Sequence, residues 1–104
     1  MGQQNPVFGG QTLNKSDTKL QPPKMFKVLI HNDDYTTMEF VVLILERVFG
    51  KNLAEATRVM LNVHNEGVGI GGVYSFEIAE TKVAAVHTIA QQYEFPLRCS
   101  LEEA

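Results

Sequence analysis

Three hydrogen-bond acceptors stand in a row at Asn32, Asp33 and Asp34, inside the stretch HNDDYTTMEF (residues 31–40), which contains no Lys or Arg. Neighbouring side chains on a turning backbone point in different directions, so Asp33 and Asp34 are not expected to share a proton as a catalytic carboxylate pair must. Asp34 is best interpreted as a turn residue that also faces the dipole of the following helix. Asn32 and Asp33 are the candidates for binding a donor from another molecule.

A further acceptor comes from His64, because helical periodicity places it on an apolar stripe one turn after Met60. An α-ammonium group offers three N–H donors and is mostly protonated at neutral pH. An asparagine carbonyl, a carboxylate and a neutral imidazole nitrogen would accept these donors, and nearby Met, Val and Leu side chains would hold an apolar first side chain. Capture of a free N-terminus by such a cluster is a recurring mode of peptide recognition.

The same residues are compatible with two further functions and with purely structural roles. His31, Asp33 and His64 have the side-chain types of a metal site, so a metal-dependent hydrolase is an alternative. A structural interaction module with an unused acidic loop is another, because a fold does not fix a function. His64 could also be an ordinary core histidine, which is the role that we assign to His31 and His87. The methionines of this region could be core fillers at helical spacing.

The composition of the chain argues against several classes of protein. A chain of 104 residues with a formal net charge of −3 is expected to form one small globular domain, and its acidic balance disfavours nucleic acid as a partner. The single cysteine, Cys99, cannot form an internal disulfide and lacks the paired spacing of a zinc site, which indicates a reducing compartment. No apolar run is long enough to span a bilayer and no basic-then-apolar leader is visible, so we expect a cytoplasmic protein without membrane contact.

The elements that must position these residues follow from apolar patterning. Residues 1–24, rich in Gln, Asn, Gly and Pro, are expected to form a flexible tail, and residues 25–104 the folded core. The core is expected to contain a strand at 25–30, a helix from Thr36 to Phe49, a helix from Asn52 to Gly67, a strand at 68–74, a helix from Ser75 towards Pro96 and a strand at 97–101. The order β-α-α-β-α-β predicts an α+β fold, with three helices covering a three-stranded antiparallel sheet.

Capping and periodicity add detail to the helices. The first helix is expected to open with a capping box of Thr36 and Glu39 and to end at Gly50. Core faces are expected at Leu53, Ala56, Met60 and Val63 of the second helix, and at Phe76, Ala79, Val83, Val86, Ala90 and Tyr93 of the third.

Four motifs in this order, NDDYTTMEF, VMLNVHNEG, IAETKV and FPLRC, resemble ClpS, the bacterial adaptor of Clp proteases, over about residues 22–103. The resemblance implies an adaptor that binds N-degrons, which are exposed N-terminal Leu, Phe, Tyr or Trp residues. Such an adaptor delivers substrate proteins to a Clp ATPase such as ClpA or ClpC, working with ClpP. The resemblance also implies no reaction on the adaptor, no cofactor, no metal, and a monomer that engages the ATPase N-domain.

The resemblance assigns roles to particular residues. It implies that Asn32, Asp33 and His64 hold the α-amino group of the substrate. The implied apolar pocket consists of Thr36, Met38, Val41, Met60, Val63 and Leu97. The implied docking surface for the ATPase includes Glu77 and Lys82. Thr37 stands where the family usually has proline after the first threonine, so the start of the first helix is expected to be less rigid here.

Overall fold

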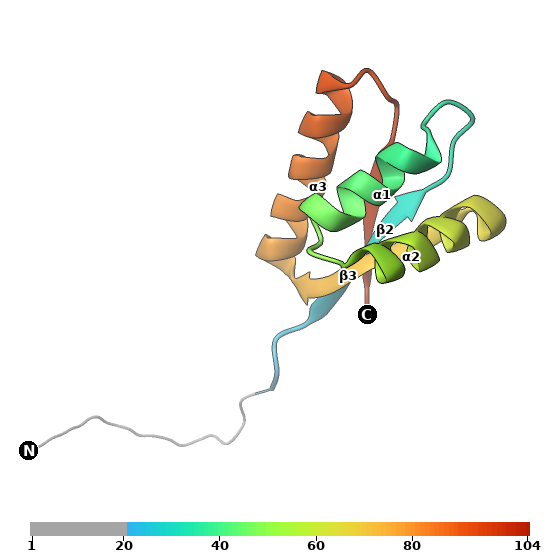
Figure 1. Ribbon diagram of the computed structural model, residues 1–104. Coiled ribbons are helices and arrows are strands. Elements are labelled where there is room, and N and C mark those ends of the chain that lie inside the picture. Colours follow the sequence, from blue (N-terminus) through green and yellow to red (C-terminus); the bar gives the residue numbers. More distant parts are fainter. Residues whose placement is uncertain (1–20) are drawn as a thin grey trace, which may run out of the picture.

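The structure, a computed structural model, describes residues 21–104 as three strands and three helices (Figure 1). In chain order these are β2 (Met25–His31), α1 (Met38–Arg47), α2 (Leu53–Glu66), β3 (Val68–Ser75), α3 (Phe76–Gln92) and β4 (Arg98–Glu103). The order and the α+β class are those predicted from the sequence. Residues 21–24 are exposed and precede β2, and the rest of the predicted tail, residues 1–20, lies outside the described residues.

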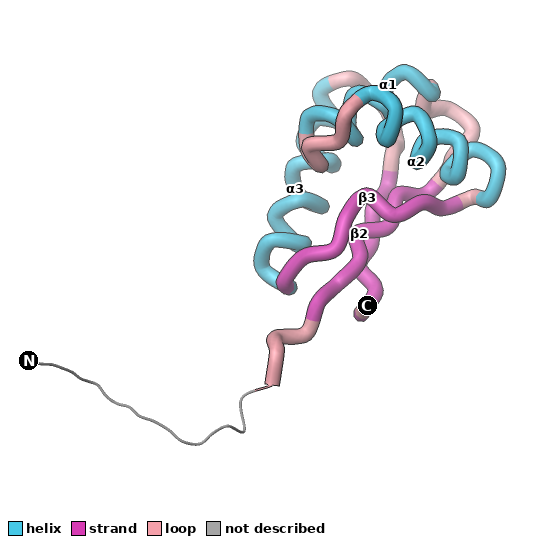
Figure 2. Tube along the Cα trace, turned by 60° about the horizontal axis from the view of Figure 1, so that its bottom comes forward, coloured by secondary structure: helices cyan, strands magenta, loops and turns pink. Residues whose placement is uncertain are grey.

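The sheet has β2 at its centre, in the order β3-β2-β4, and both pairings are antiparallel. Val28 and Ile30 are fully buried, whereas the alternating residues between and beside them are only partly buried. Successive strand residues face opposite sides of a sheet, so this alternation indicates one covered face. Figure 2 shows the three helices gathered on one side of the sheet. Ile44 and Leu45 of α1 are fully buried and belong to the same core cluster as Val28 and Ile30.

The start of α1 differs from the predicted capping box. Thr37 is the N-cap: its hydroxyl accepts a hydrogen bond from the backbone N–H of Phe40 at 3.1 Å, and the helix begins at Met38. The hydroxyl of Thr36 instead donates to the carboxylate of Asp33 at 2.7 Å. The predicted pairing of Thr36 with Glu39 was therefore wrong, because the preceding loop already uses that hydroxyl.

Replacing the observed N-cap should lower the stability of the fold. Thr37→Ala leaves an N–H of the first turn of α1 without its acceptor, so we expect the free energy of unfolding to fall by about 1 kcal/mol. Urea denaturation measures this change. Thr37→Ser keeps a hydroxyl acceptor and should stay near the wild type. Equal losses in the two variants would show that the cap hydrogen bond contributes nothing.

Glycines end the first two helices, as the sequence predicted. Gly50 has a φ of 67° and Gly67 a φ of 90°, the left-handed conformation that glycine adopts without strain. The regular part of α1 ends at Arg47 rather than Phe49, and the N–H of Gly50 bonds the carbonyl of Glu46 at 3.1 Å. The start of α2 is capped by Asn52, whose side chain accepts from the N–H of Glu55 at 2.9 Å.

Two glycines of β3 allow close packing, Gly69 against α2 and Gly71 against the ring of Phe49. A Cβ atom placed on Gly69 would lie 2.7 Å from the side chain of Val63 and 3.2 Å from the carbonyl oxygen of Val59, both in α2. A Cβ atom on Gly71 would lie 2.8 Å from the ring of Phe49. The missing side chains therefore let the strand lie directly on the helix and the ring.

The predicted core faces are correct in the middle of the helices and wrong at their ends. Ala56 and Val63 of α2 are buried, and the structure adds Val59, but Leu53 is 63% exposed. In α3, Ala79, Val86 and Ala90 are buried, whereas Phe76 and Tyr93 are about half exposed. Phe76 and Tyr93 each contact only part of the core, with ring centres 5.2 Å from those of Phe26 and Phe40 respectively, so periodicity alone overestimates their burial.

Candidate functional site

A cleft of about 510 Å³ opens where the loop between β2 and α1 meets the last turns of α2. Its lining consists of Asn32, Asp33, Asp34, Tyr35, Thr36, Thr37, Met38, Glu39, Val41, Met60, Val63 and His64. This set contains all three predicted amine-binding residues and every predicted pocket residue except Leu97. Loop and helix residues far apart in the sequence thus meet at one surface depression.

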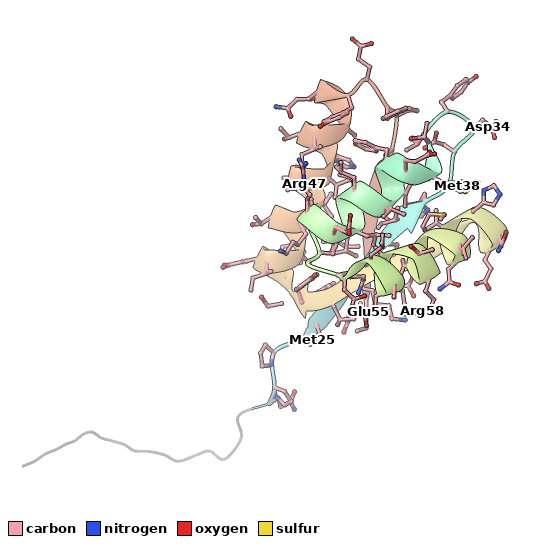
Figure 3. The ribbon with its side chains drawn as sticks, in the orientation of Figure 1. Met25, Asp34, Met38, Arg47, Glu55 and Arg58 are labelled. Carbon is pink, nitrogen blue, oxygen red and sulfur yellow. The ribbon has the colours of Figure 1, made fainter. Side chains whose placement is uncertain are left out.

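Asp33 organises the loop that forms one wall of the cleft. One of its carboxylate oxygens accepts from the backbone N–H groups of Tyr35 at 2.9 Å and Thr36 at 2.7 Å, and the other accepts from the Thr36 hydroxyl at 2.7 Å. Asp34 lies in the bend that these hydrogen bonds enclose, as expected of a turn residue, and its exposed side chain points outward from the loop (Figure 3). A carboxylate has about four lone-pair sites, so Asp33 keeps acceptor capacity for one further donor.

The charge of Asp33 is also stabilised by this loop. Partial burial pushes the pKa of Asp33 up, but the hydrogen bonds from the Thr36 hydroxyl and from the N–H groups of Thr36 and Tyr35 outweigh it and leave the pKa below the ordinary value. Asp33 is therefore ionised throughout the neutral and mildly acidic range. An anionic acceptor in the cleft favours a cationic ligand.

Removing the hydroxyl donor should raise the pKa of Asp33. We expect a higher value in Thr36→Val than in the wild type, measured from the pH dependence of the carboxyl ¹³C chemical shift. Because the folded-state pKa is depressed, ionised Asp33 contributes stability above its unfolded-state pKa, and this contribution is lost as the pH falls through the folded-state pKa. Thr36→Ser retains the donor and serves as the control. An unchanged titration in Thr36→Val would show that the hydroxyl does not stabilise the carboxylate.

Asn32 and His64 are brought together by a backbone hydrogen bond that sequence reasoning missed. The N–H of Asn32 donates to the carbonyl of Gly67 at 2.9 Å, which ties the end of β2 to the end of α2. Both side chains are exposed and line the cleft. The glycine that ends α2 in the left-handed conformation was the available signal, since it directs the chain back along β2.

The apolar part of the cleft comes from the facing sides of α1 and α2. Val41 and Val63 are buried, Met60 is half-buried, and Met38 is 44% exposed at the first turn of α1. Figure 3 shows Met38 between the two helices. The valines therefore form a fixed floor, and the two flexible methionines lie nearer the opening, where they can adapt to a ligand side chain.

The other two histidines have structural partners, as expected. The ring of His31 is hydrogen-bonded to the Ser100 hydroxyl at 2.6 Å, and that of His87 accepts from the backbone N–H of Cys99 at 3.1 Å. Burial, together with the positive charge of Arg98, lowers the pKa of His31. Within residues 21–104, no three His, Cys, Asp or Glu side chains are arranged to hold a metal ion. The alternative ligand set of His31, Asp33 and His64 is therefore not assembled.

Three other predicted site residues lie away from the cleft. Leu97 is 4% exposed in the core and lines a separate hollow beside His87, so the structure does not place it with the predicted pocket. Glu77 is exposed on α3. Lys82 is partly buried on α3. Its ammonium group donates to the carbonyl of Val48 at 2.8 Å and lies 5.5 Å from the ring centre of Tyr74. Lys82 thus joins α3 to the end of α1.

A second hollow, of about 570 Å³, lies on the other side of α2 and has the opposite character. Its charged lining consists of three bases, Lys27, Lys51 and Arg58, and two acids, Glu66 and Glu102, and β3 adds apolar residues. Figure 3 shows Arg58 on the side of α2 away from Met38. The bases of this hollow outnumber its acids, whereas the cleft is lined by acidic residues and by no Lys or Arg, so the cleft with Asp33 is the better candidate for a cationic ligand.

Comparison with known proteins gives one consistent result. Residues 21–100 match the family model described as "ATP-dependent Clp protease adaptor protein ClpS". The chain is 61% identical over 93 residues to the ClpS adapter of Desulfatibacillum aliphaticivorans, covering 89% of each chain. It is 59% identical over 87 residues to that of Desulfotalea psychrophila, covering 84% of this chain and 85% of the relative.

A solved structure agrees with these relatives. The structure of Agrobacterium tumefaciens ClpS2 bound to L-phenylalaninamide superimposes with a TM-score of 0.76 at 36% identity, covering 80% of this chain and all of that one. The fold and these relatives thus define a class of protein, the protease adaptors. The chain belongs to the ClpS family, the adaptors of ATP-dependent Clp proteases. Among residues 21–104, no helix is long and apolar enough to cross a bilayer.

Proposed function

We propose that this adaptor binds the exposed N-terminal Leu, Phe, Tyr or Trp residue of a substrate protein and delivers that protein to a Clp ATPase, ClpA or ClpC, for degradation with ClpP. One observation carries the proposal. Asn32, Asp33 and His64 line the same cleft as the apolar side chains of Val41 and Val63. The cleft therefore offers acceptors for an ammonium group beside a floor for an apolar side chain.

The chemistry of the acceptors suits an α-ammonium group. The ionised Asp33 carboxylate has one acceptor position left, and the exposed side chains of Asn32 and His64 supply a carbonyl oxygen and a ring nitrogen. Three N–H donors thus meet three acceptors, and a hydrogen bond between ionised groups is about twice as strong as a neutral one. An acetylated N-terminus has no charge and keeps only one of the three N–H donors, which gives selectivity for a free amine.

The solved relative supports this assignment. L-phenylalaninamide, the compound bound to Agrobacterium tumefaciens ClpS2, has a free α-amine, an aromatic side chain and an amide in place of the carboxylate. It therefore has the chemistry of the first residue of a protein. We infer the same ligand class for the cleft of this chain.

The pKa values of Asp33 and Cys99 are those of residues that do not take part in acid–base or nucleophilic catalysis near neutral pH. The hydrogen bonds that hold the pKa of Asp33 low make it a poor general acid or base near neutrality. Burial raises the pKa of Cys99 to about 12, so its thiol is not a ready nucleophile. We therefore propose that the substrate leaves the adaptor chemically unchanged.

We place the contact with the ATPase N-domain on α3. Glu77 is exposed there between Phe76 and Ile78, which are 47% and 51% exposed. Exposed apolar side chains around a charge are typical of a protein-binding surface. Because Lys82 already bonds the carbonyl of Val48, we expect it to support this surface by fixing α3.

Fluorescence anisotropy with three labelled peptides tests the proposal. Peptides that begin with Leu or Phe should bind, and the same Phe peptide with an acetylated amine should not. Equal binding of the free and acetylated peptides would contradict an amine site. Addition of Zn²⁺ should not raise the melting temperature, whereas a specific metal site would raise it.

Met38 is expected to limit the width of the pocket. Its side chain lies at the first turn of α1 and lines the cleft, so Met38→Ala should admit β-branched Val or Ile at the substrate N-terminus. A methylene in an apolar pocket discriminates by about 1–3 kcal/mol, and the preference for Leu over Ile should fall by that order. Competition binding with Leu- and Ile-initiated peptides measures it. An unchanged ratio would make Met38 a packing residue only.

A further inference from the structure

The cleft continues into an apolar hollow along the seam between α1 and α2. This hollow of about 400 Å³ is lined by Met38, Glu39, Val42, Leu53, Thr57 and Met60, and it shares Met38, Glu39 and Met60 with the cleft. Leu53 is 63% exposed although it is a large apolar residue. A ligand that occupies the cleft can therefore reach further apolar surface without leaving the seam.

The spacing of the hollow is set by α2. Leu53, Thr57, Met60 and His64 lie on one stripe, because they are three or four residues apart. With a rise of about 1.5 Å per residue, Thr57 lies roughly 4.5 Å and Leu53 roughly 10.5 Å beyond Met60, in the direction away from His64. Because the cleft and the hollow share Met38, Glu39 and Met60, an extended peptide whose amine is held near His64 can leave the cleft in that direction.

The geometry of an extended chain selects one residue of the peptide for the hollow. Side chains alternate between the two sides of such a chain, so those of the first and third residues point the same way, about 6.6 Å apart. With the first side chain beside Met60, the third falls between Thr57 and Leu53, and the second points away from the seam. We propose that the hollow is a subsite for an apolar third residue of the substrate, an inference that rests on the proposed function.

This subsite narrows the substrate class. Proteins with a large apolar third residue are favoured over those with a small one, and the second residue, which points away from the seam, is free to vary. A leucine side chain in this half-open hollow is only partly buried, so it contributes less binding free energy than a fully buried one. We therefore expect a third-position Leu to raise the affinity roughly three- to tenfold over Ala.

Three peptides that begin Phe-Ala-Ala, Phe-Leu-Ala and Phe-Ala-Leu, with one common labelled tail, test the proposal. On the wild-type protein, Phe-Ala-Leu should have the lowest dissociation constant, and the other two should agree within about twofold. The Phe-Ala-Ala peptide and its acetylated form serve as the separate test of the amine site. Failure of Phe-Ala-Ala to bind better than its acetylated form would therefore reject the proposed function itself.

Two substitutions in α2 test whether the higher affinity of the Phe-Ala-Leu peptide arises in the hollow. Leu53→Ala removes an exposed wall of the hollow and should abolish the advantage of Phe-Ala-Leu while leaving Phe-Ala-Ala binding unchanged. Leu61→Ala is the matched control, because Leu61 is also exposed on α2, at 44%, and lines neither the cleft nor the hollow. The proposal is overturned by equal gains at the second and third positions, or by a third-residue advantage that persists in Leu53→Ala.

Discussion

Asp33→Ala should weaken the binding of a Phe-initiated peptide by roughly 10- to 100-fold, the largest effect expected of any single cleft substitution. The carboxylate acts twice. It holds the loop through three hydrogen bonds, from the N–H groups of Tyr35 and Thr36 and from the Thr36 hydroxyl, and it places a negative charge beside the ligand amine. The alanine variant loses both roles, and fluorescence anisotropy measures the dissociation constant.

Two control variants distinguish the structural role of Asp33 in the loop from the role of its negative charge in binding. Asp33→Asn keeps a carbonyl oxygen for the N–H groups of Tyr35 and Thr36, so its loop amide signals should stay near the wild type in NMR spectra while binding still weakens. Asp34→Ala removes an exposed carboxylate that also lines the cleft but accepts none of the three loop hydrogen bonds, so it should bind within about twofold of the wild type. Equal losses of peptide affinity in Asp33→Ala and Asp34→Ala would mean that only the net negative charge of the loop contributes, and not the position of Asp33.

Gly69→Ala should lower the free energy of unfolding by about 1–3 kcal/mol, the range for an overpacked core. The added methyl group would lie 2.7 Å from Val63 and 3.2 Å from the carbonyl oxygen of Val59. Val63 is buried and the carbonyl belongs to the helix backbone, so neither can move away at little cost. The strand must separate from α2, and urea denaturation records the loss.

The neighbouring residue supplies the control for this strand. Ile70 is 43% exposed and faces the uncovered side of the sheet, so Ile70→Val should change stability by less than about 1 kcal/mol. Because Val63 also lines the cleft, Gly69→Ala should weaken peptide binding as well. A Gly69→Ala protein as stable as the wild type would show that β3 does not need its glycine for packing.

Much of the fold could be predicted from local signals in the sequence. Asn52 and Gly67 bound α2 as expected, because a side-chain cap and a left-handed glycine act within a single turn. The start of α1 could not be predicted in this way. Thr36 and Thr37 are adjacent and both can cap a helix, and the choice depends on which hydroxyl the Asp33 carboxylate has already engaged.

The candidate site was likewise predictable where local signals suffice and not where it depends on contacts between distant parts of the chain. Residue types alone suggested acceptors for an amine at Asn32, Asp33 and His64, but their meeting in one cleft depends on the hydrogen bond from Asn32 to Gly67, which joins distant parts of the chain. Leu97 was assigned to the pocket by family resemblance, and its place in the core depends on how α3 packs against β4. Contacts of this kind have no local signature in the sequence.

The central claim is that the cleft holds a free N-terminal amine, and a crystal structure of the protein with a Phe-initiated peptide tests it most directly. We expect the peptide amine nitrogen to lie within about 2.7–3.2 Å of acceptor atoms of Asn32, Asp33 and His64. We also expect the phenyl ring to lie over Val41 and Val63. A peptide bound instead in the basic hollow beside Lys27 and Arg58, or with its amine in solvent, would contradict the claim.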